Sequence, residues 1–84
     1  MYKIWLHEVP EKNIEEGWWG GNGRSRQNSV IYDRTEYEDE AFEMDDMNAL
    51  LIYTNFKSLG WPCEVIPKIT NKRKLEILDS GIFI

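Results

Sequence analysis

The chain has 84 residues and a net charge of −5, with 15 acidic residues against 10 lysines and arginines. A chain this short folds as a single domain over residues 1–84, and 42% hydrophobic residues make it globular rather than disordered. The acidic balance disfavours non-specific nucleic-acid binding as the main activity, because neutralising phosphates requires a surplus of Lys and Arg.

The cysteine content and the hydropathy indicate the cellular compartment in which we expect the protein. Cys63 is the single cysteine, which excludes an internal disulfide and fits a reducing environment. No apolar run approaches the length of about 20 residues that spans a bilayer. The N-terminal segment is interrupted early by His7, Glu8 and Pro10, unlike a signal peptide. We therefore expect a cytoplasmic protein, in its own cell or in a host cell, without membrane contact.

The first third of the chain predicts strands separated by a glycine-rich stretch. Residues 2–9 alternate between apolar and polar, which is typical of a half-buried strand, and Pro10 ends the pattern. Residues 17–26 contain adjacent tryptophans, four glycines and a tight turn at Asn22-Gly23. A further strand is expected over residues 29–32. Adjacent residues of a strand point to opposite faces, so one tryptophan is expected in the core and the other on the surface.

An acidic run over residues 33–46 leads into the main helix. We expect a strand or a short helical turn near residues 37–44, followed by a break at Asp45-Asp46. The sequence of residues 35–38 also fits a capping box, which would start one long helix at Glu36 and continue it to Leu59. Such a helix would be about twice the usual length, and its apolar residues would not form a continuous stripe.

The main helix is predicted at about residues 46–59. Asp45 or Asp46 can cap its start, and the Gly60-Trp61-Pro62 sequence stops it. Its apolar residues form two stripes, Met47, Leu50, Leu51 and Thr54 on the first and Ala49, Ile52, Tyr53 and Phe56 on the second. A helix that is apolar nearly all round must be buried on more than one side. The second stripe is therefore covered by loops and tryptophans of the same chain, or by a second subunit in a homodimer.

The end of the chain predicts a strand over residues 63–69, in which Pro67 favours an edge position or a bulge. A hairpin turn is expected at residues 70–73, with a returning strand at residues 74–78. The fold class that follows is α+β. It consists of a small, mostly antiparallel sheet of four to five strands with one main helix packed on one face.

Catalytic and cofactor signatures are missing from the sequence. His7-Glu8 lacks the second histidine of a metalloprotease helix, and no glycine-rich loop has the spacing that cradles a phosphate. Cys63 and His7 could form a thiolate pair, but a single cysteine in an apolar strand is usually a small buried hydrophobe. Zinc and calcium sites require ligands that the chain does not supply. We therefore expect no enzyme, no catalytic residue, no metal site and no cofactor.

The leading functional hypothesis is a small acidic protein-binding module. It would act as an inhibitor or regulator of a protein with a basic surface, such as a nuclease or another nucleic-acid-handling enzyme. This is the type found among nucleic-acid mimics, virus-encoded antagonists and antitoxins. Carboxylates would steer the partner and aromatic side chains would provide affinity. The residues expected to bind the partner are Glu36, Tyr37, Glu38, Asp39, Glu40, Phe42, Glu43 and Asp46. The acidic run is otherwise only a solvated surface.

The alternative hypothesis is a single-stranded nucleic-acid-binding protein. An exposed indole beside arginines can stack on a base, and a basic turn can contact phosphates. The residues expected to carry this activity are Trp18, Trp19, Arg24, Arg26, Lys72, Arg73 and Lys74. The negative net charge makes nucleic acid the less favoured partner.

Overall fold

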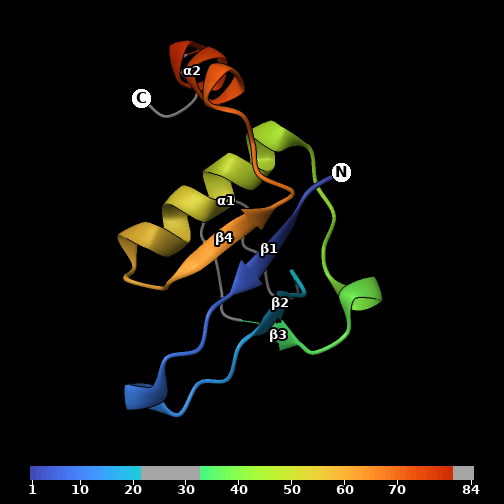
Figure 1. The fold of residues 1–84 in the computed structure, drawn as a ribbon, viewed down its shortest axis with the longest axis vertical. Coiled ribbons are helices and arrows are strands. Elements are labelled where there is room, and N and C mark those ends of the chain that lie inside the picture. The colour runs from blue at the N-terminus through green and yellow to red at the C-terminus, as the bar shows by residue number, and fades with distance from the viewer. Residues whose placement is uncertain (22–32, 81–84) are drawn as a thin grey trace.

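A computed structural model gives the structure of the protein and describes residues 1–21 and 33–80. Within these ranges, four strands form an antiparallel sheet in the order β3-β2-β1-β4, and a long helix, α1, lies on one face of it (Figure 1). The predicted α+β class is confirmed. The strands are β1 (Lys3–Leu6), β2 (Gly17–Trp19), β3 (Arg34–Thr35) and β4 (Cys63–Ile66). The helices are α1 (Asp46–Ser58), α2 (Asn71–Asp79) and two 3-10 turns, η1 (Pro10–Lys12) and η2 (Glu38–Glu40).

The core lies between the sheet and α1. In β1, Ile4 and Leu6 are buried and point toward the helix, as the alternation of residues 2–9 predicts. Trp19 is completely buried and contacts the ring of Phe56 edge-to-face, with the ring centroids 5.6 Å apart. Phe56 is also completely buried. The second stripe of α1 therefore contributes to the core of the single chain, whereas the association state of the protein remains a prediction.

The ends of α1 agree with the sequence signals to within one residue. Asp45 is the N-cap, and its Oδ1 accepts a hydrogen bond of 2.8 Å from the backbone N–H of Asn48. At the other end, Gly60 has a φ of +82°, which favours glycine. The N–H of Gly60 donates to the carbonyl of Lys57, and the N–H of Trp61 donates to the carbonyl of Phe56. This is the Schellman arrangement, which satisfies carbonyls that the helix leaves unpaired.

The long-helix alternative starting at Glu36 is wrong. After η2, Ala41 is extended, and Met44 pairs with Tyr2 through two backbone hydrogen bonds of 2.8 and 3.0 Å. The short helical turn expected within residues 37–44 is present as η2. The break before α1 therefore results from pairing of the chain with the start of β1.

The predicted C-terminal hairpin is also wrong. Residues 70–73 do not form a hairpin turn and residues 74–78 do not form a strand, because Thr70 caps α2 by accepting a 3.2 Å hydrogen bond from the N–H of Arg73. Ile77 is buried against the core, while Leu75 is 62% exposed, so the two side chains do not share a sheet face. The strand β4 ends at Ile66 rather than at Ile69.

Several other expectations concern the strands and the membrane. Of the two alternatives for Pro67, the edge position is confirmed for the strand, because β4 is an outer strand among the described ones. The proline itself follows the strand, which ends at Ile66. The strand expected at residues 29–32 and the turn at Asn22-Gly23 lie outside the described residues.

No helix of the described ranges is both long enough and apolar enough to cross a bilayer.

Candidate functional site

The face of the sheet opposite α1 carries a pair of tryptophans at its centre. Trp5 of β1 and Trp18 of β2 are directly opposite each other, and their rings meet edge-to-face with centroids 4.9 Å apart at 77°. Such pairs add to the stability of a sheet and hold each ring in a fixed orientation. The same row across the sheet continues to Thr35 on one side and to Glu64 on the other. Both helices contribute their buried residues to the opposite side. Within the described chain, the tryptophan pair therefore lies on the face without a helix.

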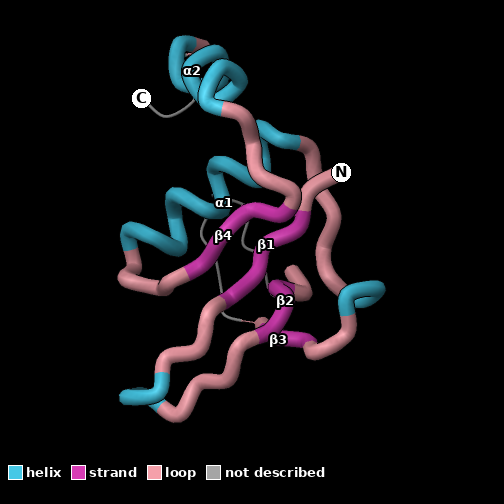
Figure 2. The backbone as a smooth tube through the Cα atoms, viewed as in Figure 1, coloured by secondary structure: helices cyan, strands magenta, loops and turns pink. Residues whose placement is uncertain are grey.

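Lys3 connects this face to the acidic loop. Its Nζ lies 6.0 Å from the centroid of Trp18, 3.6 Å from a carboxylate oxygen of Glu38 and 3.7 Å from one of Glu43. It also donates to the backbone carbonyl of Glu38 at 3.3 Å. Figure 2 shows the path of this loop from β3 through η2 and back toward the sheet before α1 begins. One lysine thus positions the loop beside the tryptophan pair while Glu38 and Glu43 remain largely exposed.

A hollow of about 390 Å³ next to Trp5 collects further carboxylates. Its walls are formed by Trp5, Gly17 and Arg34 together with Glu8, Glu15, Glu16 and Glu36. Three carboxylates of residues 8–16 thus lie beside Glu36 of the acidic run 33–46, next to the exposed side of β1. Negative charges in a concave surface with an aromatic wall raise the local concentration of cationic groups.

Gly17 permits this arrangement because β2 and β3 approach closely there. A Cβ at this position would lie 2.7 Å from the Cγ of Arg34 and 2.8 Å from the backbone oxygen of Thr35. Any side chain would therefore push β3 away from β2. The glycine allows the Arg34 side chain to cross over β2 and reach the chain that precedes it.

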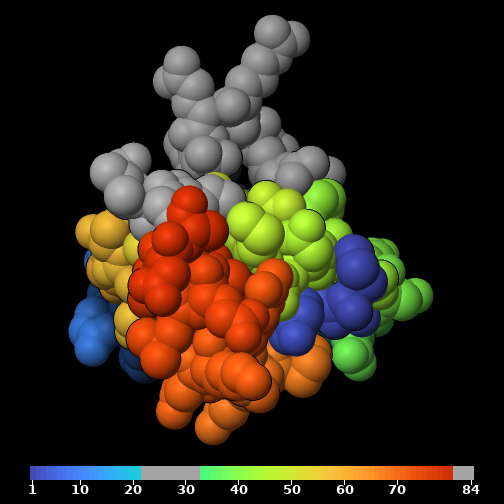
Figure 3. Space-filling model, turned by 90° about the horizontal axis from the view of Figure 1, so that it is seen from above, coloured from blue at the N-terminus to red at the C-terminus, as the bar shows by residue number. Residues whose placement is uncertain are grey.

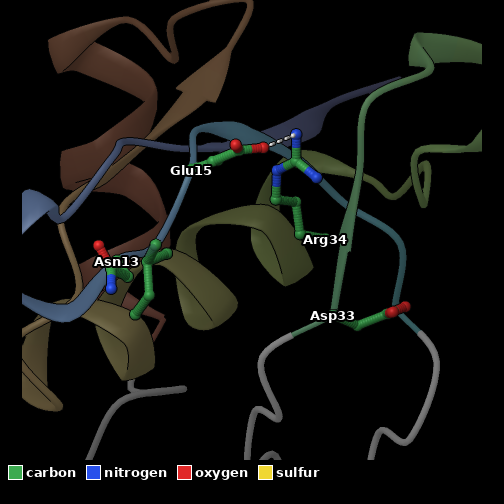
Figure 4. A pocket seen from close by; sticks show the side chains of 5 residues that line it. Asn13, Glu15, Asp33 and Arg34 are labelled. Carbon is green, nitrogen blue, oxygen red and sulfur yellow. Dashed lines mark ion pairs between the residues drawn. The ribbon is translucent and has the colours of Figure 1, made fainter.

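Arg34 is the cation in the wall of the hollow, and it is held by the chain itself. Its Nε donates to the carbonyl of Glu16 at 2.7 Å, and its Nη2 lies 3.4 Å from a carboxylate oxygen of Glu15. The ion pair with Glu15 is drawn in Figure 4, in an adjoining hollow of about 540 Å³ that Asn13, Ile14 and Asp33 complete. Glu8, Glu16 and Glu36 remain exposed at the first hollow.

Most residues of the predicted partner-binding set lie together on the loop around η2. Glu36, Tyr37, Asp39 and the other carboxylates of this loop are exposed, and Tyr37 has 57% of its surface accessible. A hydrogen bond with Glu36 raises the pKa of Tyr37, and the negative charge of that carboxylate raises it further. Glu40 accepts a 2.7 Å hydrogen bond from the hydroxyl of Thr35, which fixes the start of the loop to β3.

Two members of that set lie elsewhere. Phe42 packs against the core, where its ring centroid is 5.8 Å from that of Trp19, so it is not the exposed anchor that we expected. Asp46 forms a bidentate ion pair with Arg73, with Nε–Oδ2 and Nη2–Oδ1 distances of 2.6 and 3.2 Å. The hydrogen bonds from Arg73 lower the pKa of Asp46. This carboxylate joins α1 to α2 rather than facing a partner.

The residues of the nucleic-acid alternative do not come together in the described part of the chain. Trp19 is in the core, and Arg73 is engaged with Asp46. Lys72 and Lys74 are exposed on α2. This helix lies at one end of the molecule, away from β2, which carries Trp18 (Figure 1), and it faces the viewer when the molecule is seen from above (Figure 3). Arg24 and Arg26 lie outside the described residues.

The sequence interpretation missed Trp5, Glu8, Glu15 and Glu16 as parts of the site. The alternation of β1 does place Trp5 on the face opposite Ile4 and Leu6, so the sequence alone could have identified Trp5 as a residue of this face. The pairing of Trp5 with Trp18 could not be predicted from the sequence. It depends on the register between two strands, and the connection between them has no regular alternation that would fix this register.

Among the described residues, neither a metal-binding cluster nor the cysteine points to a ligand, and the comparisons with known proteins point to none either. No group of three or more His, Cys, Asp or Glu side chains in the described ranges could hold a metal ion. Burial raises the pKa of the Cys63 thiol to about 11, so this thiol is mostly protonated at neutral pH. Comparison with protein-family models, with curated proteins and with solved structures found no match for the chain.

Proposed function

We propose that the protein is a small binding module that docks onto a basic surface of another protein. The docking face consists of the tryptophan pair and the carboxylates around it, namely Trp5, Trp18, Glu8, Glu16, Glu36 and Glu38. The observation that carries the proposal is the meeting of two acidic segments beside an aromatic pair on the helix-free side of the sheet.

The two kinds of side chain have different tasks in this proposal. Carboxylates at the rim accelerate the encounter with a cationic partner and select against acidic ones. Tryptophans that lose water on docking supply most of the affinity. Because Trp5 and Trp18 already contact each other across the strands, little side-chain entropy is lost when a partner covers them.

The partner that best complements this face has lysines or arginines around an apolar patch. Enzymes that handle nucleic acids have such surfaces, and a row of carboxylates can occupy the positions that phosphates would take. The protein would then act as an inhibitor or regulator by competing with nucleic acid. The single-stranded nucleic-acid alternative has less support, because Glu16 and Glu36 would repel a phosphate backbone beside Trp5.

The test compares two variants with the same change of charge. Glu16→Lys with Glu36→Lys alters the docking face, and Glu11→Lys with Asp79→Lys alters exposed carboxylates outside it. Both variants and the wild type are used to capture partners from the native cell, and association rates of captured partners are measured by stopped flow. The docking-face variant is expected to associate at least about tenfold more slowly, and the control within about twofold of wild type.

Two results would contradict the proposal. The first is equal capture and equal association rates for both variants, which would make the carboxylates a solvated surface. The second is retention of an oligonucleotide at about 50 mM salt with a steep dependence on salt, which would favour the nucleic-acid alternative.

A further inference from the structure

A groove lies on the opposite edge of the sheet from β3, between β4, α1 and α2. It has a volume of about 440 Å³ and an apolar floor formed by Leu50, Tyr53, Val65 and Ile69. Two lysines, Lys68 and Lys74, line the same groove. Neither forms an ion pair with a residue of the described ranges. We call this the edge groove.

On the side of β4 that faces this groove, no described strand pairs with the backbone of β4. The N–H of His7 donates to the carbonyl of Pro62 at 2.9 Å, so Pro62 directs its carbonyl toward β1. Backbone groups alternate in direction along an antiparallel strand, so Glu64 and Ile66 also face β1. Cys63 and Val65 therefore direct their N–H and C=O groups away from β1. No other described strand pairs with β4 on that side.

We propose that the edge groove binds an extended acidic peptide as an additional strand beside β4. Free backbone groups on an edge strand pair with an extended chain, and neighbouring pockets select its side chains. The apolar floor fits the side chains on one side of such a peptide. Lys68 and Lys74 fit carboxylates on the other. The one carboxylate that lines the groove, on Glu64, lies 3.1 Å from Nε2 of His7 and forms no ion pair with either lysine.

This inference goes beyond the proposed function. The docking face is acidic and selects a basic protein, whereas the edge groove carries two lysines against the single carboxylate of Glu64 and selects the opposite charge. Pro62 and Pro67 flank β4 and leave only Cys63 and Val65 free to pair, so the recognised segment is short. A short acidic segment of a partner or a regulatory protein fits this length.

The test uses the full chain and a displayed library of random hexapeptides. Selection is expected to enrich peptides in which acidic residues alternate with β-branched ones. The best peptide is then synthesised with N-methyl groups at alternate positions. Methylation of the positions whose N–H faces β4 is expected to weaken binding at least about tenfold, because it removes the backbone pairing. Methylation of the intervening positions changes binding by less than about twofold.

Two further readouts locate the peptide without relying on an unfolded variant. Amide hydrogen exchange at Cys63 and Val65 is expected to slow on binding, while exchange at Glu64 and Ile66, which already pair with β1, stays constant. Lys68→Glu with Lys74→Glu is expected to weaken binding at least about tenfold, and Lys72→Glu, a lysine of α2 outside the groove, by less than about twofold.

Three outcomes would overturn the inference. The enriched peptides lack acidic residues, the two methylation patterns have the same effect, or exchange at Cys63 and Val65 is unchanged on binding. If exchange at these two amides instead becomes slower as the protein concentration rises, with no peptide present, the edge binds a second copy of the chain. None of these results bears on the docking face.

Discussion

The two faces of the sheet place two adjacent tryptophans of β2 in different surroundings. Trp19 is completely buried between the sheet and α1, whereas Trp18, one residue earlier, lies on the helix-free face against Trp5. The covered face is held by apolar packing, including the edge-to-face contacts of Trp19 with Phe42 and Phe56. The helix-free face is held by an aromatic pair and by ion pairs of Lys3. The comparison teaches that two identical side chains, adjacent in sequence, can have different places: Trp19 belongs to the core, whereas Trp18 lies on the face that we propose for docking.

The largest effect is expected from removing the two indoles separately. Trp19→Ala leaves a cavity beside Phe56 and is expected to lower the free energy of unfolding by about 3–5 kcal/mol. Trp18→Ala removes an edge-to-face contact and is expected to cost about 1 kcal/mol. Urea unfolding of the two variants measures both values. Equal losses would mean that the two faces contribute alike to stability and would end the comparison.

A smaller effect is expected at Cys63, on the covered face. A pKa of about 11 against an ordinary value of 9.0 reduces the thiolate fraction at pH 8 about a hundredfold, and only the thiolate is nucleophilic. Alkylation by iodoacetamide is therefore expected to be at least that much slower in the native protein than in urea. Similar rates in the two states would show that this side of β4 opens readily.

The smallest effect concerns the ion pair between α1 and α2. Because Arg73 lowers the pKa of Asp46 below 3.8 in the folded protein, the pair stabilises the fold above that value. Its contribution is lost as the pH falls through the lower, folded pKa. Asp46→Asn is therefore expected to be less stable than wild type at neutral pH, and the difference should shrink at roughly pH 3.

Urea midpoints at the two pH values give this comparison, and Asp39→Asn, an exposed carboxylate of η2, serves as the control. A difference between wild type and Asp46→Asn that stays constant with pH would mean that Asp46 acts only through helix capping or packing.

The local signals of the sequence were sufficient for α1 and β1. Asp45 and Gly60 fix the ends of the helix through hydrogen bonds that span a few residues, so the sequence contains all that is needed. The alternation in β1 likewise depends on neighbouring residues only. The C-terminal segment was misread because Leu75 and Ile77 alternate as in a strand. The Thr70 cap and the good helix formers after it favoured α2.

The docking face was only partly predictable for a different reason. Glu36 and its neighbours were found from charge alone, but the contribution of Trp5 and Glu8 depends on strands that pair across long connections. Ion pairs such as that of Asp46 with Arg73 join residues 27 positions apart. No local pattern reports such pairings, and they decided which carboxylates remain free.

The order of the strands has a consequence for synthesis of the protein. β1 is translated first and occupies the interior of the sheet, yet its outer neighbour β4 comes about sixty residues later. Ile4 and Leu6 share one buried cluster with residues of α1 and β4, so in a growing chain they lack this cover until both elements have left the exit tunnel. Completion of the sheet thus depends on contacts between residues far apart in the sequence, a topology that slows folding.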